Sequence, residues 1–158
     1  MVVDDVDAQS YAECGHTLFS QGKYVEAEAA YREAVRLDQD NAVYHDDLGR
    51  ALYAQDKYPE AEAALTEATR LDPGNALYHN DLGAALYAQN KYPAAEAAYR
   101  EAVRLDPGNA VCRDGLGDTL YAQGNYPGAE AVYREVQGGG DRAAGSVPAR
   151  SRRRRLSQ

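Results

Sequence analysis

The stretch AVYHDDLGRALYAQDKYPEAEAALTEATRLDPGN (residues 42–75) is followed at once by ALYHNDLGAALYAQNKYPAAEAAYREAVRLDPGN (residues 76–109). The two blocks have 34 residues each and agree at 26 positions. A repeat of that length indicates one small supersecondary unit copied along the chain, with the core formed between neighbouring copies. We therefore expect function on a surface shared by several copies rather than in a single catalytic pocket.

Glycine marks the same place in every unit of the 158-residue chain, at Gly15, Gly49, Gly83 and Gly117. The spacing predicts four units, at residues 8–41, 42–75, 76–109 and 110–137. The first unit is more diverged than the others, and the fourth is incomplete. A short leader, residues 1–7, precedes the units. Residues 138–158 contain almost no large apolar side chains and are predicted to form a disordered basic tail.

Within each unit the apolar residues have helical spacing. In the second unit, Leu48, Ala51 and Leu52 lie on one helical stripe, and a second stripe runs from Ala61 to Ala68. Each unit is therefore predicted to contain two amphipathic helices of about 14 residues, which start near its first and eighteenth positions.

Residues with special backbone preferences mark the ends of these predicted helices. The first helices follow side chains that can cap free backbone N–H groups: Asp7, Asn41, Asn75 and Asn109. In the last three units the second helix begins at a proline, which suits the first turn: Pro59, Pro93 and Pro127. The intervening turns contain residues that tolerate a left-handed backbone: Gly22, Asp56, Asn90 and Gly124.

Together these residues resemble the tetratricopeptide repeat family over most of residues 8–137. In the second unit the family's signature positions hold Leu48-Gly49, Leu52, Tyr58, Ala61, Leu65, Ala68 and Pro73. The family's usual tryptophan near the start of the first helix is replaced by Tyr11, His45, His79 and Arg113. The resemblance implies an all-α fold, a right-handed superhelical solenoid of antiparallel helix pairs. It also implies that the protein binds segments of other proteins in a concave groove lined by the first helices.

Transferring the family's groove positions to this chain gives a predicted peptide-binding groove that is aromatic at one level and acidic at another. The aromatic level consists of Phe19, Tyr53, Tyr87 and Tyr121. The other candidate groove residues are His16, Arg50, Asp46, Asp47, Asn80, Asp81, Asp114 and Asp118. Carboxylates pair with cations and tyrosine faces attract them, so we expect a ligand with Lys or Arg beside apolar or aromatic side chains. An equally open alternative is that the tyrosines are the family's usual filler and the acids a solvated face.

Other chemistries fit the sequence less well. A subgroup of the resembled family grips the C-terminal carboxylate of chaperones with cationic side chains, but Asp47 and Asp81 occupy corresponding places here. His45 and His79 belong to adjacent units, roughly 8–10 Å apart, too far to share a metal ion, so packing roles are expected. Repeated carboxylates lack the asymmetry of a catalytic site. The sequence therefore predicts no enzyme activity, metal, cofactor or small-molecule substrate.

The net charge of −8 divides into −13 for residues 1–137 and +5 for residues 138–158, and the acidic body argues against nucleic acid as a partner. The N-terminal stretch lacks an apolar core and no apolar run is long enough to cross a bilayer, so a cytoplasmic protein without a membrane role is predicted. Cys14 takes the place of Leu48 and is expected to be buried. Cys112 takes the place of Tyr44 and Tyr78 and is expected to be more exposed.

Two functional hypotheses follow. The first is an adaptor that binds a partner segment in the groove. The second is a self-assembling scaffold joined through the last repeat. The sequence after Gln137 does not have the pattern of a capping helix, which would normally cover the apolar face of the final unit. A chain truncated or shifted in frame near Gly138 would explain the same break. In the tail, Arg150 and residues 152–155 are predicted to contact the molecule's own acidic groove and to compete with outside ligands.

Overall fold

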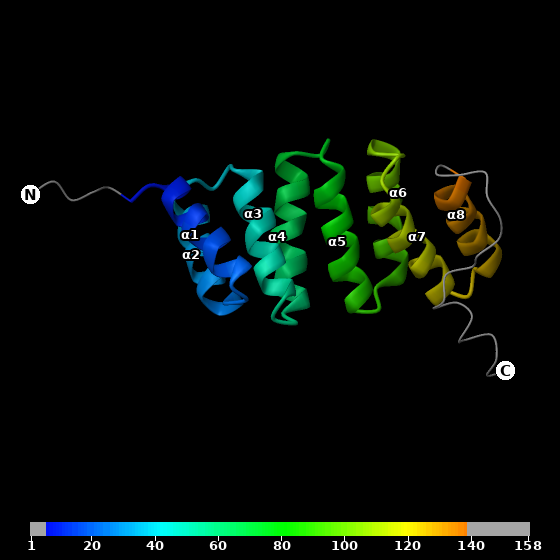
Figure 1. The fold of residues 1–158 in the computed structure, drawn as a ribbon, viewed down its shortest axis with the longest axis horizontal. Coiled ribbons are helices and arrows are strands. Elements are labelled where there is room, and N and C mark those ends of the chain that lie inside the picture. Colours follow the sequence, from blue (N-terminus) through cyan, green and yellow to red (C-terminus); the bar gives the residue numbers. More distant parts are fainter. Residues whose placement is uncertain (1–5, 139–158) are drawn as a thin grey trace, which may run out of the picture.

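The computed structural model describes residues 6–138, and these form eight helices arranged as four antiparallel pairs. The first helices of the pairs are α1 (Ala8–Ser20), α3 (Ala42–Tyr53), α5 (Ala76–Ala88) and α7 (Ala110–Ala122). The second helices are α2 (Tyr24–Leu37), α4 (Tyr58–Leu71), α6 (Tyr92–Leu105) and α8 (Tyr126–Gly138). Figure 1 shows the pairs side by side in a row, from α1 in blue to α8 in orange. The all-α prediction is confirmed.

The helix ends lie where the sequence predicts them. The four predicted capping side chains all accept a hydrogen bond from a backbone N–H of the following helix, as Asp7 does from Ser10 at 2.8 Å. Asp56 and Asn90 have φ of 60°, Gly22 has 73° and Gly124 has 80°, so all four turns contain the expected left-handed residue. At 13 residues α8 is one residue shorter than α4, so the fourth unit contains both of its helices.

The repeated glycine has a packing role inside each helix pair. A Cβ atom at Gly15, Gly49, Gly83 or Gly117 would come within 3.0 Å of the side chain at one equivalent position of the second helix. The side chains at that position are Tyr31, Leu65, Tyr99 and Tyr133. Because interiors are already close-packed, any side chain at the glycine position would overpack the pair. Glycine thus lets a large residue of the second helix lie against the backbone of the first.

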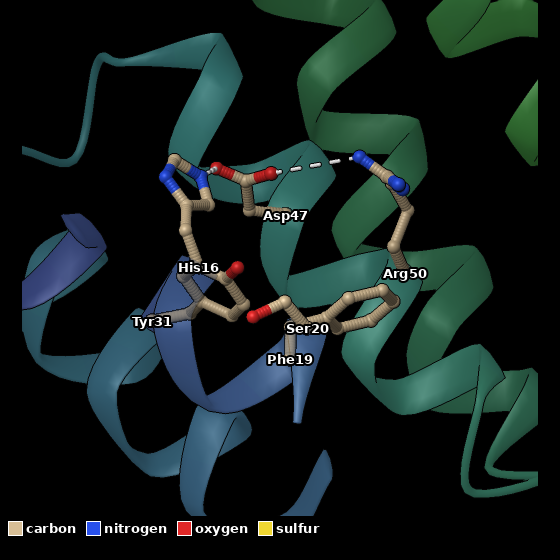
Figure 2. Close-up of a pocket in the computed structure, with 6 residues that line it drawn as sticks. All are labelled: His16, Phe19, Ser20, Tyr31, Asp47 and Arg50. Carbon is tan, nitrogen blue, oxygen red and sulfur yellow. Dashed lines mark hydrogen bonds and ion pairs between the residues drawn. The ribbon is translucent and has the colours of Figure 1, made fainter. Parts of the chain in front are cut away.

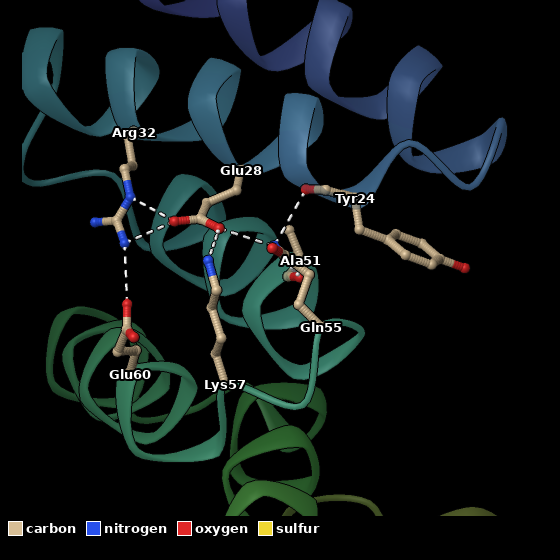
Figure 3. A network of polar contacts seen from close by, with 7 residues as sticks. All are labelled: Tyr24, Glu28, Arg32, Ala51, Gln55, Lys57 and Glu60. Atoms are coloured by element: carbon tan, nitrogen blue, oxygen red, sulfur yellow. Dashed lines mark hydrogen bonds and ion pairs between the residues drawn. The ribbon is translucent and has the colours of Figure 1, made fainter.

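Neighbouring units are joined by a buried glutamate, shown for Glu28 of α2 in Figure 3. Gln55 donates to Glu28 Oε2 at 2.8 Å, Lys57 donates to the same oxygen at 2.9 Å, and Arg32 binds the other oxygen. Burial raises the pKa of Glu28, but the hydrogen bonds from Lys57, Gln55 and Arg32 outweigh it and lower the pKa to about 2. This link fixes α2 against the start of α4 and the end of α3.

The same link recurs at the second junction and loses its lysine at the third. Glu62 accepts hydrogen bonds from Gln89 and Lys91, both at 2.7 Å. At the third junction Glu96 accepts one from Gln123 at 2.6 Å, but Asn125 stands where the lysine would be.

The two cysteine expectations are wrong. Cys14 is exposed, whereas Cys112 is buried, with 1% of its surface accessible. Leu48, the equivalent of Cys14, is buried at the junction with the preceding unit, and α1 has no such unit before it among the described residues. Position in the array therefore decides the exposure of Cys14, whereas Cys112 is buried like Tyr78, the equivalent residue of the third unit.

Candidate functional site

The twelve predicted groove residues all belong to the first helices, α1, α3, α5 and α7, and we call the surface that they share the first-helix face. A small pocket opens on this face between the first two units. It is lined by His16, Phe19, Ser20, Tyr31, Asp47 and Arg50 (Figure 2). Four of these six side chains were predicted from the sequence. The structure therefore brings together predicted residues that are up to 34 positions apart in the chain.

Polar contacts across the pocket join α1 to α3. His16 Nε2 lies 2.7 Å from Asp47 Oδ2 and donates to it, and Arg50 Nη1 lies 3.9 Å from Asp47 Oδ1. The Arg50 guanidinium carbon is 5.4 Å from the centre of the Phe19 ring, a cation–π distance. The ring of Tyr31 lies below His16, with their centroids 5.6 Å apart (Figure 2). The pocket thus combines one carboxylate, two basic side chains and two aromatic rings.

A similar arrangement is found at the second junction and is lost at the third. Arg50 Nε lies 4.0 Å from Asp81 Oδ2, and Asn80 donates to Asp81 Oδ1 at 3.0 Å. At the third junction the equivalent pair is Ala84 and Gly115. The ring of Tyr99 lies so close to Gly115 that a Cβ atom there would overlap it. The ring therefore occupies the space that a side chain at this position would need. Polar pairs that join neighbouring first helices are therefore found, among the described residues, at the first two junctions.

Asp46 is the most unusual residue of this face. Only 4% of its surface is accessible, and its Oδ1 atom has no hydrogen-bond partner among the described residues. Burial is the main cause that raises the pKa of Asp46 to about 7, and the charges of Asp81 and Asp47 raise it further against the opposing effect of Arg50. Burial also raises the pKa of Asp81, although Asn80 and Arg50 oppose the shift.

Each ring of the predicted aromatic level already packs on a neighbouring ring. Phe19, Tyr53, Tyr87 and Tyr121 each meet the tyrosine at the start of the following helix edge to face, with centroids 5.0–5.3 Å apart. Such pairs stabilise the turn between the two helices of a unit. Tyr53 is nevertheless 39% exposed. These rings therefore have a structural contact while part of their surface stays accessible.

In the fourth unit Asp114 and Asp118 are both exposed and are far from the pocket along the row of helices. Tyr133 of α8 donates to Asp118 Oδ1 at 2.5 Å. Partial burial and the charge of Asp118 raise the pKa of Asp114. The structure thus places these two predicted residues on the same set of helices but not in the pocket.

Sequence reasoning missed Ser20 and the tyrosines of the second helices. Tyr31 lines the pocket, Tyr99 fills the third junction and Tyr133 reaches Asp118. The glycine spacing could have indicated these tyrosines, because each repeated glycine of a first helix makes room for the second-helix residue that faces it. A tyrosine at this position therefore indicates a ring packed against the first helix, and in the fourth unit its hydroxyl group reaches Asp118.

His45 and His79 have structural contacts. Each donates its Nε2–H to a backbone carbonyl of the preceding loop, to Gln39 at 2.8 Å and to Pro73 at 2.9 Å. Within residues 6–138 no three His, Cys, Asp or Glu side chains are grouped closely enough to hold a metal ion. None of the helices in that range is both long and apolar enough to cross a membrane.

Four stacked helix pairs with a shared face on the first helices define a helical-repeat protein of the protein–protein interaction class. The chain belongs to the tetratricopeptide repeat family: family models described as "Tetratricopeptide repeat" match residues 47–110 and 86–138, and one described as "TPR repeat" matches residues 15–56. This fold typically serves as an interaction scaffold without catalysis. Comparison with curated protein sequences gave no match.

Solved structures agree with the family assignment. The first TPR of Spaghetti (RPAP3), bound to the HSP90 peptide SRMEEVD, is 28% identical, with 77% of this chain and 97% of that chain covered and a TM-score of 0.73. The first TPR domain of human RPAP3 is 26% identical, with 77% and 96% covered and a TM-score of 0.72. Pseudomonas aeruginosa pilF is 25% identical, with 89% and 64% covered and a TM-score of 0.78. The predicted superhelical solenoid is confirmed.

Proposed function

We propose that the first-helix face binds an extended segment of a partner protein that carries Lys or Arg beside apolar or aromatic side chains. The observation that carries this proposal is the excess of carboxylates at the first two junctions, where, within residues 6–138, the basic partners of Asp46, Asp47 and Asp81 are His16 and Arg50, two for three acids. A cation from the partner would restore the charge balance. The exposed part of Tyr53 and the ring of Phe19 offer apolar and cation–π contacts beside it.

The charge of this face distinguishes the proposed ligand from that of a structural neighbour. The peptide bound by the Spaghetti domain, SRMEEVD, contains three acidic side chains. In this chain, acids at Asp46, Asp47 and Asp81 would repel such a segment. The peptide SRMEEVD is therefore a useful negative probe, and we expect the protein to prefer a cationic segment to it.

The test uses two matched synthetic probes, acetyl-(Lys-Tyr-Ser)4-amide and its neutral counterpart acetyl-(Gln-Tyr-Ser)4-amide. We expect the lysine probe to bind the full chain more tightly than the glutamine probe and SRMEEVD, with an advantage that shrinks at high ionic strength. Replacing Tyr53 and Tyr87 together by Ala should weaken binding, whereas Val25→Ala, an exposed change on α2, should not. Equal binding of all three probes would contradict the proposal, as would unaltered binding by the double variant.

Two further proposals concern the ends of the array and the compartment. The tail segment with Arg150 and residues 152–155 lies outside the described residues, and its competition for the acidic face remains our proposal. Deleting residues 138–158 should then raise affinity for the lysine probe at low ionic strength, whereas unchanged affinity would exclude competition. The cytoplasm, inferred from the sequence, likewise remains our prediction for the compartment.

Self-assembly through the last repeat is the second candidate function. Val132 and Tyr133 of α8 are half-buried, whereas the equivalent Ala64 and Leu65 of α4 are buried by the following unit. If a second copy covers this surface, the size of the protein will increase with concentration, and Val132→Glu will abolish the increase. A size independent of concentration would exclude this function and leave the adaptor proposal intact.

A further inference from the structure

Asp46 is a buried acid that the repeat fold does not require. The equivalent residues of the first and third units are Ala12 and Asn80, and both are buried like Asp46. The fold therefore accepts an apolar or a neutral polar side chain at this place. A carboxyl group in the same surroundings costs free energy, because a buried charge without a partner loses its hydration. Since Asp46 weakens the fold, a role in ligand binding explains its presence better than a role in folding does.

The groups around Asp46 leave it without a cation of its own among the described residues. On its own helix, α3, it is flanked by Asp47 and Arg50, and α5 presents Asp81. The Arg50 guanidinium is shared, because it lies 3.9 Å from Asp47, 4.0 Å from Asp81 and above Phe19. On α1, His16 is engaged by Asp47. Tyr78 and Asn80 of α5 add neutral groups, and Asn80 donates to Asp81.

We propose that Asp46 and Asp81 form a subsite for one cationic side chain of the bound segment, lysine or arginine, and that seating this cation releases a proton from the pair. The inference rests on the proposed function and specifies which residues of the first-helix face bind the cation. Asp81 is the accessible half of the subsite, with 20% of its side chain exposed. Asp46, with its unpartnered Oδ1, is the buried half.

Proton release follows from the surroundings of the free carboxyl group. Burial, with the charges of Asp81 and Asp47, raises the pKa of Asp46 to about 7, so close to half of the free molecules hold the proton at neutral pH. A cation placed beside the pair favours the ionised form and lowers this pKa. The proton leaves to the buffer as the cation binds. Affinity should therefore rise about tenfold between about pH 6 and pH 8, as the ionised fraction does.

The experiment is calorimetric titration of the full chain with acetyl-(Lys-Tyr-Ser)4-amide at pH 7, in phosphate and in Tris, whose different ionisation enthalpies reveal the number of protons exchanged. We expect release of about half a proton per bound probe and binding about tenfold tighter at pH 8 than at pH 6. Asp46→Asn should abolish the release, and the chain itself shows that Asn fits, at Asn80. Asp46→Ala, which copies Ala12 of the first unit, provides a second variant.

Two control variants exclude other titrating groups. Glu130→Gln changes an exposed acid of α8, outside the first-helix face, and should leave the release intact. Loss of the release in His16→Gln would assign the proton to His16, since histidine exchanges protons near neutrality, and would contradict the subsite. In the unaltered protein, the carbon signal of the Asp46 carboxyl group should titrate near pH 7 and move to lower pH when the lysine probe saturates the face.

Failure of the inference differs from failure of the proposed function. If the lysine probe binds in preference to the glutamine probe but no proton is released, the groove proposal stands and the Asp46–Asp81 subsite is wrong. The subsite is also wrong if Asp46→Asn keeps the full pH dependence. If the lysine probe does not bind at all, the proposed function fails, and the subsite with it.

Discussion

Replacing Asp46 by Asn should make the ligand-free protein more stable at neutral and alkaline pH. The change removes a titrating charge and keeps the size and shape of the side chain. Asn80 shows that an amide is accommodated at the equivalent place of the next unit, where it donates to Asp81. The fold should therefore be retained, and the difference between the two proteins should report the cost of ionising a single buried carboxyl group.

The size of the effect follows from the pKa of this group. Folding raises the pKa of Asp46 from 3.8 to about 7, chiefly by burial and then by repulsion from Asp81 and Asp47. A raised pKa means that the folded protein holds the proton more tightly than the unfolded chain. The folded state is thus increasingly penalised as pH rises from about 4 to about 7. A pKa difference of about three corresponds to about 4 kcal/mol, which relaxation around the charge reduces to about 2–4 kcal/mol.

The assay is urea denaturation of the wild type and Asp46→Asn at several values between about pH 4 and pH 8. Below about pH 4 the two free energies of unfolding should agree, since Asp46 is then protonated in both states. At about pH 8 the variant should be more stable by the full amount. Asp114→Asn is the matched control and should show a much smaller dependence on pH. A variant that is less stable than the wild type at pH 8 would refute the conclusion that Asp46 is a strained, unpaired acid.

Three further predictions concern the links between and within the units. Glu28→Gln should lower the free energy of unfolding at neutral pH by up to about 3 kcal/mol, because the pKa of Glu28 falls from 4.5 to about 2 on folding. Denaturation curves should show this difference between the two proteins vanishing as pH drops through about 2. Glu130→Gln, the equivalent 55% exposed residue of α8, should change stability little. Gly49→Ala should lower the free energy of unfolding by about 1–3 kcal/mol in thermal or urea unfolding, since the new Cβ atom would overlap Leu65. This loss should exceed the gain from the better helix propensity of alanine. Gly74→Ala, the control, should be nearly neutral. Iodoacetamide should modify Cys14 in the native protein but Cys112 only after unfolding, because burial shields Cys112 and raises the pKa of its thiol; mass spectrometry of the native protein showing both modified would contradict the burial assignment.

The fold could be predicted from the sequence because each of its determinants is local or periodic. Capping side chains such as Asn41, turn residues such as Asp56 and the prolines of the second helices act within a few residues, and the structure places all of them as expected. Burial at the ends of the array was not predictable in this way. Cys14 has the same place in its unit as Leu48, but among the described residues it lacks a preceding unit to cover it. Equivalence between units holds only where both neighbours are present.

The candidate site lies in the departures from the repeat rather than in the repeat itself. Units 42–75 and 76–109 differ at few positions, yet three of these differences fall on the first-helix face or directly behind it: Asp46 becomes Asn80, Arg50 becomes Ala84 and Leu65 becomes Tyr99. The first two remove the unpartnered acid and the guanidinium that opposes its raised pKa, and the ring of Tyr99 packs against Gly115, the position held by Asp47 and Asp81 at the earlier junctions. Residues that build the core must stay similar from unit to unit, because every copy packs on the next in the same way. Residues of the first-helix face are less constrained, so positions such as those of Asp46 and Arg50 can differ from unit to unit while the stack of helix pairs is retained.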